Sequence, residues 1–221
     1  MAEKPKKILL QELLEARSAA YAFLAMGYRR EPTSELFAVL TFSRSPGDGG
    51  DSFLASLGAL SDAERERLRG ELAAEYPALF LNASERAVHP FESVYTSASG
   101  RVMQQAREEV LREYREAGMD RAADFHEPED HLAVECEFMA ALCRKALEAF
   151  KAGDRAGGLE LLRRQEAFLG RHLMVWVPRF CQDLRQATSS AFYLWLATMT
   201  AEMLESERDA VPHLIALSTA A

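Results

Sequence analysis

Apolar side chains recur at every third or fourth position along most of the chain, which is the spacing of one face of an α-helix. The segment from residue 128 to residue 152 has the strongest repeat, carried by Leu132, Cys136, Met139, Cys143, Leu147 and Phe150. Pro128 suits the first position of a helix, and Gly153 breaks the pattern. We therefore predict a long amphipathic helix that begins at Pro128 and ends before Gly153.

The N-terminal part of the chain contains two further helical patterns. Residues 8–26 are apolar at helical spacing, and Gly27 follows as a predicted stop. A shorter pattern covers residues 34–42. Residues 43–51, which contain one proline and three glycines, are predicted to form a flexible loop.

A capping box predicts where the next helix begins. The side chain of Ser61 can accept a hydrogen bond from the amide of Glu64, while Glu64 reaches back to Ser61. This helix is predicted to end near Tyr76, because Pro77 disfavours the helical conformation of the residue before it. Further helices are predicted at residues 101–117 (ended by Gly118), 155–169, 172–185 (bent by Pro178), 188–205 and 210–217.

Two long irregular segments interrupt this pattern, Leu81–Gly100 and Met119–Glu127. Connections of this length in a helical protein are often functional. The sequence contains no internal repeat and no βαβ pattern. We predict an all-α, compact multi-helix fold with two long irregular loops. It is a single helical domain over residues 1–221, with the possibility of two helical halves that meet near residues 118–128.

Composition limits the classes of function. The 221 residues are 48% hydrophobic and carry a formal net charge of −8, which argues against nucleic acid as the main partner. Every apolar run is shorter than the roughly 18 residues that a membrane span needs. No signal-peptide core follows the N-terminal lysines, so we expect a cytoplasmic protein. The three cysteines, Cys136, Cys143 and Cys181, form no CxxC pair and are predicted to be reduced thiols in the core.

The first candidate site is the aromatic part of the first long loop, with the end of the helix before it. Its side chains could hold an apolar peptide, with the polar ones as guides. The alternative is that the aromatic rings only pin a long loop to the core. The candidate residues are Tyr76, Leu79, Pro90, Phe91, Ser93 and Tyr95.

The second candidate site is the acidic entry to the long helix, Glu127, Glu129, Asp130 and His131. In the first turn of a helix, acidic side chains and free amides can receive cationic or polar groups of a partner. The alternative is that Asp130 and His131 only cap the helix, with the histidine satisfied in the core. A metal site formed by His131, Glu135 and His126 is a weaker alternative, because no HExxH pattern is present.

Catalytic motifs are missing from the sequence. It contains no GxGxxG after a strand, no GxxxxGK[ST] and no GxSxG, and no partner pattern that would activate a cysteine. We therefore predict that the protein is not an enzyme.

Three stretches of the sequence resemble a known protein family. The stretch from Glu127 to Met139 looks very like the E-P-x-D-H-x-x-x-E-L-x-F-M signature of the TorD/DmsD/NarJ-type maturation chaperones for redox enzymes. Two flanking patterns are also similar, Tyr76-x-x-Leu79-Phe80 followed by Pro90-Phe91-x-Ser93-Val94-Tyr95, and His172-Leu173-x-x-Trp176-x-Pro178-x-Phe180 followed by Phe192-Tyr193. The resemblance covers most of the chain in the same order.

This resemblance implies an all-α cytoplasmic chaperone that binds the twin-arginine signal peptide of a molybdopterin oxidoreductase. The chaperone would hold the apoprotein until its cofactor is inserted and then release it for export. The resemblance also implies weak binding of guanine nucleotide, and a monomer or a domain-swapped dimer. The family's peptide-binding positions match Tyr76, Leu79, Pro90, Phe91, Asp130 and His131. The chain departs from the pattern at His89, where a second proline is common, at Phe91, where tryptophan can occur, and at Cys136, where leucine is usual.

Three other functions remain as alternatives. A NarJ-like assembly factor would bind the mature part of its client rather than a leader. A nucleotide hydrolase would use the two long loops. A metal-binding regulator would use His126, His131 and Glu135. Under either chaperone hypothesis, we expect the site to form where the two long loops and the helix start at Pro128–His131 come together.

Overall fold

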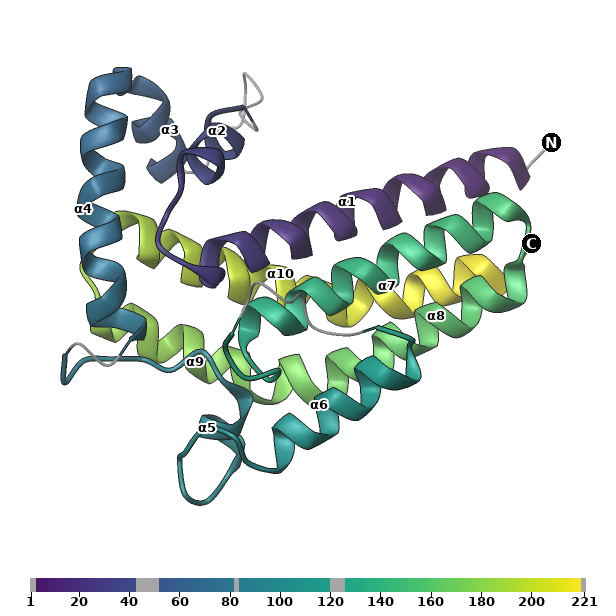
Figure 1. Cartoon of the computed structure of the whole chain (residues 1–221). Helices are drawn as coiled ribbons and strands as arrows, with labels where there is room; N and C mark the ends of the chain where they lie inside the picture. The colour runs from purple at the N-terminus through teal and green to yellow at the C-terminus, as the bar shows by residue number, and fades with distance from the viewer. Residues whose placement is uncertain (1–2, 43–51, 82–83, 120–125, 220–221) are drawn as a thin grey trace.

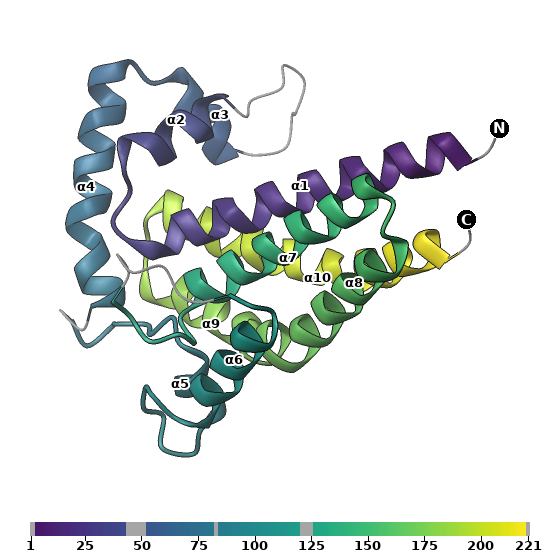
Figure 2. The ribbon, with the colours of Figure 1, turned by 45° about the vertical axis from the view of Figure 1, so that its right-hand side comes forward.

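The strongest helical pattern of the sequence forms α7 (Leu132–Ala152), which lies at the centre of the fold. We describe a computed structural model, and it covers residues 3–42, 52–81, 84–119 and 126–219. Helix α7 packs along α1 (Glu3–Arg29) and α8 (Arg155–Phe168), and its inner face is fully buried. With α10 (Ala191–Thr219) these helices run side by side, as Figures 1 and 2 show. Gly153 ends α7 in the left-handed conformation (φ +82°), as predicted.

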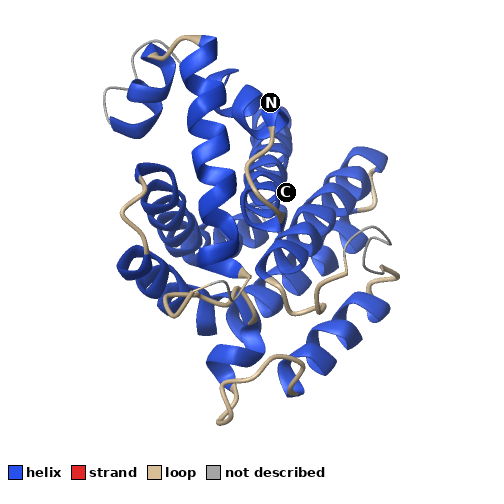
Figure 3. Ribbon diagram, turned by 60° about the vertical axis from the view of Figure 1, so that its left-hand side comes forward, coloured by secondary structure: helices blue, strands red, loops and turns tan. Residues whose placement is uncertain are grey.

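Helices account for the regular structure of the described ranges, apart from one isolated β-bridge between Phe91 and His131. The all-α prediction is therefore confirmed (Figure 3). The three cysteines are buried and unpaired with one another, as expected of reduced core thiols. No helix in the described part of the chain combines the length and the apolar character that crossing a membrane requires.

The run from α8 to α9 (Met174–Ala187) is continuous, and this differs from the two separate helices that we predicted. A one-turn π-helix, η1 (Leu169–Leu173), joins them with helical backbone angles on both sides. A π-turn inserts one extra residue into a helix and changes the direction in which the following side chains point. The predicted break is therefore a bulge, and it includes His172.

Two helices continue through a proline where the sequence predicted either an end or two separate helices. Helix α10 contains Pro212, so the helices predicted at 188–205 and 210–217 are one helix. Helix α4 (Asp62–Phe80) contains Pro77 and does not end near Tyr76. Each proline removes one backbone donor, but the buried neighbours Val211, Leu214, Leu79 and Phe80 keep the helix packed on the core. Burial outweighs the local cost.

Gly27 was predicted to stop the first helix, yet α1 runs through it to Arg29. The glycine lies where α1 crosses α10, and a Cβ atom there would stand 3.1 Å from Leu196 Cδ1. Its role is therefore close approach of two helices rather than helix termination.

The remaining N-terminal helices stand at one end of the molecule. Helices α2 (Ser34–Phe42) and α3 (Ser52–Ala59) pack beside α4, which crosses the end of the bundle in Figures 1 and 2. The capping box at the start of α4 is present with both hydrogen bonds, as predicted for Ser61 and Glu64.

The first long loop is not wholly irregular, because it contains α5 (Glu92–Thr96). Helix α6 (Gln105–Glu116) follows, starting four residues later than the predicted Arg101. Gly118 has φ +64° just after α6, which confirms it as the stop signal. Residues 120–125 of the second loop lie outside the described ranges, as does the loop predicted at residues 43–51.

Candidate functional site

The first long loop meets the start of α7. The amide of Leu132 donates to the carbonyl of Pro90 at 2.9 Å, and the amide of Glu92 donates to the carbonyl of Asp130 at 3.0 Å. The rings of Phe91 and His131 lie edge to face, with centroids 5.0 Å apart. The expectation that the segments around Phe91 and Pro128–His131 come together is confirmed.

Helix α7 begins later than the sequence predicts. His131 is its N-cap, and the ring atom Nδ1 accepts a hydrogen bond from the amide of Ala133 at 3.0 Å. The carbonyl of Pro128 accepts from His131 in a tight turn, and the carbonyl of Asp130 is already used by Glu92. Those backbone groups are therefore not free to start a helix at Pro128. The capping alternative for His131 is confirmed.

Burial sets the charge of the histidine at this N-cap. The side chain of His131 is 3% exposed. Burial, followed by the nearby charge of Arg29, lowers the pKa of His131 to about 3. His131 is therefore neutral at physiological pH and can keep accepting the hydrogen bond of Ala133.

The two acidic residues just before His131 already have partners within the chain. Asp130 is fully buried (0% exposed), and its Oδ2 accepts from the amide of Ser93 at 2.9 Å. Glu129 forms an ion pair with Arg107. The prediction that these carboxylates present themselves to a partner's cations in the first helical turn is contradicted for Asp130 by its burial. Asp130 positions the loop of Ser93 instead.

A groove of about 430 Å³ opens beside this junction, between the end of α4, the loop before α5 and the start of α7. We call it the α4–α7 groove. Its apolar walls come from α4, from the first long loop, from Val102 and from Pro128, and Leu81 and Val102 stand 53% and 39% exposed. The apolar lining consists of Tyr76, Phe80, Leu81, Pro90, Phe91, Val102 and Pro128, and the polar lining consists of Arg29, Arg30, Glu31, His89, Glu127 and His131.

Two carboxylates, Glu31 and Glu127, line the groove without a hydrogen bond or ion pair to any other described residue. The pKa of Tyr76 is raised, first by burial and then by the charges of Glu127 and Glu31, which places both acids near its hydroxyl. That hydroxyl donates to the carbonyl of Tyr28 at 2.9 Å. The groove thus combines apolar walls with two available anions.

The groove contains five of the ten residues predicted from the sequence, namely Tyr76, Pro90, Phe91, Glu127 and His131. The other five lie elsewhere. Leu79 is buried in the core, and the hydroxyl of Ser93 accepts from the amide of Gln104 at 3.0 Å. Glu129 and Asp130 have the partners described above.

Tyr95, the last of these, faces a different cavity. It stacks on Trp176 at 5.6 Å and lines a separate hollow of about 430 Å³ with His89, Arg179 and Asp183. Tyr95 therefore does not share a surface with Phe91.

Glu31 is the residue that sequence reasoning missed. It follows Arg29-Arg30 at the end of α1, and nothing in its local pattern indicates a site. Only the crossing of α1 with α4 and α7 brings Glu31 beside Glu127. A cluster of three charges in a row at the end of an apolar helix was the one available signal.

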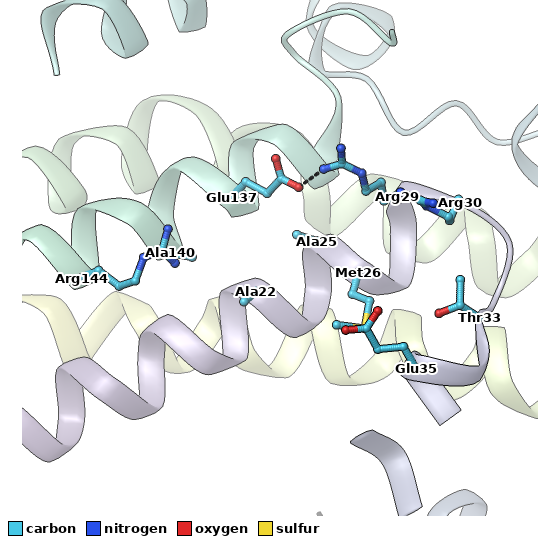
Figure 4. A pocket seen from close by; sticks show the side chains of 10 residues that line it. All are labelled: Ala22, Ala25, Met26, Arg29, Arg30, Thr33, Glu35, Glu137, Ala140 and Arg144. Carbon is cyan, nitrogen blue, oxygen red and sulfur yellow. Dashed lines mark hydrogen bonds and ion pairs between the residues drawn. The ribbon is translucent and has the colours of Figure 1, made fainter. Parts of the chain in front are cut away.

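A third cavity, of about 410 Å³, lies between α1, α7 and the start of α2 (Figure 4). It shares Arg29 and Arg30 with the α4–α7 groove, and Arg29 forms an ion pair with Glu137 across it. Small side chains, Ala22, Ala25 and Ala140, form part of its lining.

The residues proposed for a metal site are not gathered. His126 is exposed, Glu135 is fully buried, and His131 uses Nδ1 to cap α7. Across the described ranges, no group of three or more His, Cys, Asp or Glu side chains is arranged to hold a metal ion.

Comparison with known proteins gives consistent relatives. The family model described as "Nitrate reductase delta subunit" matches residues 49–182. A protein named chaperone protein TorD from Photobacterium profundum is 27% identical over 194 residues, covering 81% of this chain and 86% of the relative. The protein of the same name from Vibrio parahaemolyticus is 30% identical and covers 67% of each chain. That from Vibrio cholerae (strain ATCC 39541) is 30% identical and covers 72% of this chain and 70% of the relative.

The family match includes the whole α4–α7 groove except the end of α1, and it agrees with the motif from Glu127 to Met139. This match covers more than half of the chain, so the protein belongs to the TorD/NarJ family, whose family model carries the description "Nitrate reductase delta subunit".

Proposed function

We propose that this protein is a redox-enzyme maturation chaperone whose α4–α7 groove binds the twin-arginine leader of a molybdopterin oxidoreductase. The observation that carries the proposal is the groove itself, in which an apolar lining with Leu81 and Val102 exposed stands beside Glu31 and Glu127. Family membership supports the chaperone part, because the relatives are named chaperone protein TorD.

The chemistry of the groove suits such a leader. A twin-arginine leader joins two guanidinium groups to an apolar stretch. A guanidinium binds carboxylates through paired hydrogen bonds, which favours Glu31 and Glu127 as its acceptors. The apolar stretch can bury its side chains on Phe91, Leu81 and Val102, which supplies most of the binding free energy.

The delay of export follows from occupancy of the groove. While the arginine pair lies against the two carboxylates, the export machinery has no access to it. The chaperone therefore holds the client back during cofactor insertion and releases it afterwards. The chain has no catalytic step in this cycle.

Isothermal calorimetry with a synthetic client leader tests the proposal. We expect the wild-type protein to bind the leader, and we expect Glu31→Gln with Glu127→Gln to weaken binding by at least tenfold, because two charge-assisted contacts are lost. Glu202→Gln, an exposed acid on α10, is the matched control and should bind like wild type. Equal affinity of the double variant and the control would show that the groove is not the leader site.

A second candidate function is a NarJ-like assembly factor that binds the mature part of its client. The family description "Nitrate reductase delta subunit" supports this alternative. A pull-down with client that lacks its leader separates the two. Loss of capture favours the leader-binding chaperone, and capture equal to that of the full client favours the assembly factor.

A further inference from the structure

Beneath the α4–α7 groove lies a set of buried titratable side chains that the groove itself does not use. We call Glu92, Asp130, Glu135 and His172 the acid cluster. Each is between 0% and 3% exposed. They come from α5, from the turn before α7, from α7 and from the π-turn η1, so the cluster brings four segments of the chain together next to Phe91 and His131.

The contacts within the acid cluster are short but incomplete. His172 Nδ1 lies 2.8 Å from Glu92 Oε2. Trp176 Nε1 donates to Glu135 Oε2 at 3.1 Å. Asp130 Oδ1 and Glu135 Oε1 are buried and have no hydrogen-bond partner among the described residues. A buried oxygen without a donor is costly for a carboxylate anion and much less so for a protonated acid.

The π-turn explains how His172 reaches this interior position. In η1 the helix widens by one residue, and the imidazole lies against the ring of Phe168 with centroids 4.6 Å apart. π-turns often occur at functional sites. Here the turn brings the one buried imidazole of α8–α9 to the carboxylate of Glu92.

The charges around the acid cluster do not balance. Tyr114 of α6 and Cys136 of α7 face it and add no positive charge. Arg107, whose charge is felt by Asp130, is paired with Glu129, and Arg171, the neighbour of His172 in the chain, is paired with Glu113. Three carboxylates thus share an enclosed space with one imidazole, and they cannot all be ionised there.

We propose that Glu135 keeps a proton in the folded protein and that the protonated acid cluster positions α5 and the Pro90–Phe91 wall beneath the groove. When the proton is lost as the pH rises, the added negative charge loosens that wall and weakens peptide binding. The second part of the inference rests on the proposed function of the groove, whereas the first part does not.

The direction of the pH effect follows from burial. Burial, with the charge of Glu92 next, raises the pKa of Glu135 well above its usual range. The folded state therefore holds a proton that the unfolded state has lost. Stability from this proton is fully present below the pKa of an unfolded glutamic acid, and it is lost as the pH rises through the folded pKa of Glu135.

Trp176 reports directly on the acid cluster, because it donates to Glu135 and is fully buried. Trp195 is the other tryptophan of the chain, so Trp195→Phe leaves Trp176 as the only one. In that background we expect the Trp176 emission to titrate with Glu135, at a pH well above the usual range of a glutamic acid. Glu135→Gln, which mimics the protonated acid, should abolish the titration, whereas the exposed control Glu148→Gln on α7 should keep it.

The same variants test the link to binding. Wild-type affinity for a twin-arginine leader should fall by about tenfold as the pH rises through the Trp176 titration, and the affinity of Glu135→Gln should stay level. His89 of the groove is present in both proteins, so it contributes equally to both affinities.

Four results decide the inference. A Trp176 emission that does not change with pH, or that titrates equally in Glu135→Gln, overturns it. A titrating emission with a pH-independent leader affinity overturns the link to the groove and keeps the proton on Glu135. Failure of any leader to bind refutes the proposed function, and the emission still tests the cluster. If Glu135→Gln does not fold, Glu92→Gln replaces it, and the proposal then expects the Trp176 titration to shift to lower pH.

Discussion

Two clusters of buried polar side chains in this protein differ in their charge balance. In one cluster, Arg17 of α1 binds Glu207 of α10 through three hydrogen bonds of 2.7–3.0 Å, and it also donates to Gln165 of α8 at 2.6 Å. The hydroxyl of Tyr21 donates to the same Glu207 at 2.8 Å. We call these four residues the balanced cluster, since it holds one cation and one anion.

The acid cluster beneath the groove holds three carboxylates against one imidazole, and two of its oxygens lack a donor. The balanced cluster links α1, α8 and α10, and none of its residues lines the groove. Buried groups with strongly shifted pKa values gather at functional sites more often than elsewhere. One polar cluster therefore fixes helices to each other, whereas the other holds an excess of buried acid next to the α4–α7 groove.

The largest expected effect comes from breaking the balanced cluster. Arg17→Met leaves the carboxylate of Glu207 buried without its cation and should lower the free energy of unfolding by about 3–5 kcal/mol. Denaturant unfolding at neutral pH measures it. Arg17→Met combined with Glu207→Leu removes both charges and should recover most of the loss. A double variant as unstable as the single one would contradict the charge-balance explanation.

The next largest effect is a loss of stability at low pH that depends on His131. Its folded pKa of about 3 lies below its usual value, so the unfolded chain takes up the proton first as the pH falls. Stability should be full above about pH 6.5 and should decrease below it, by on the order of 3 kcal/mol. Asparagine caps helices well without titrating, so His131→Asn should flatten this part of the stability–pH curve. An unchanged curve would refute the assignment.

Two variants of Asp130 distinguish a residue that positions α5 from one that contacts the leader directly. Asp130→Ala leaves the buried amide of Ser93 without an acceptor and should cost about 2 kcal/mol of stability. It should also weaken leader binding, because α5 loses its attachment to the start of α7. Asp130→Asn keeps an acceptor oxygen and should bind the leader like wild type in calorimetry. If asparagine weakened binding as much as alanine, Asp130 would contact the leader directly.

The smallest expected effect comes from Arg30, whose charge has the same sign as the arginines of a leader. Arg30 is exposed, lines the groove and should repel the arginines of a leader. Arg30→Ala should therefore raise leader affinity by about threefold at low salt and leave the stability unchanged, since exposed charge interactions are weak and screened. A lower affinity would mean that Arg30 binds the client rather than repels it.

Local sequence rules predicted the interiors and many ends of the helices. The capping box at Ser61 and the stops at Gly118 and Gly153 depend on contacts within a few residues, and the structure confirms them. The helix ends predicted at Pro77 and Gly27 are wrong, and the break predicted before Pro212 is absent, for one shared reason. Each has a poor helical propensity, but the surrounding helix buries enough apolar surface to outweigh it.

For the candidate site, the sequence predicted which segments meet but not which side chains line the groove. The motif located the segments that meet, because it marks the turn at Pro90–Phe91 and the N-cap at His131. It could not tell which side chain faces outward. Asp130 turns inward because its oxygen is needed by Ser93, and Glu31 joins the site through a helix crossing that no local pattern encodes.

A double-mutant cycle measures whether Glu127 binds an arginine of a client leader, as we propose. Calorimetry would measure four affinities, with wild type and Glu127→Gln each binding a leader that has its arginine pair or one arginine replaced by glutamine. We predict a coupling free energy of at least about 1 kcal/mol, because each change removes the same charge-assisted contact. Additive effects, with a coupling free energy near zero, would show that Glu127 does not contact the arginines of the leader and that these bind elsewhere on the molecule.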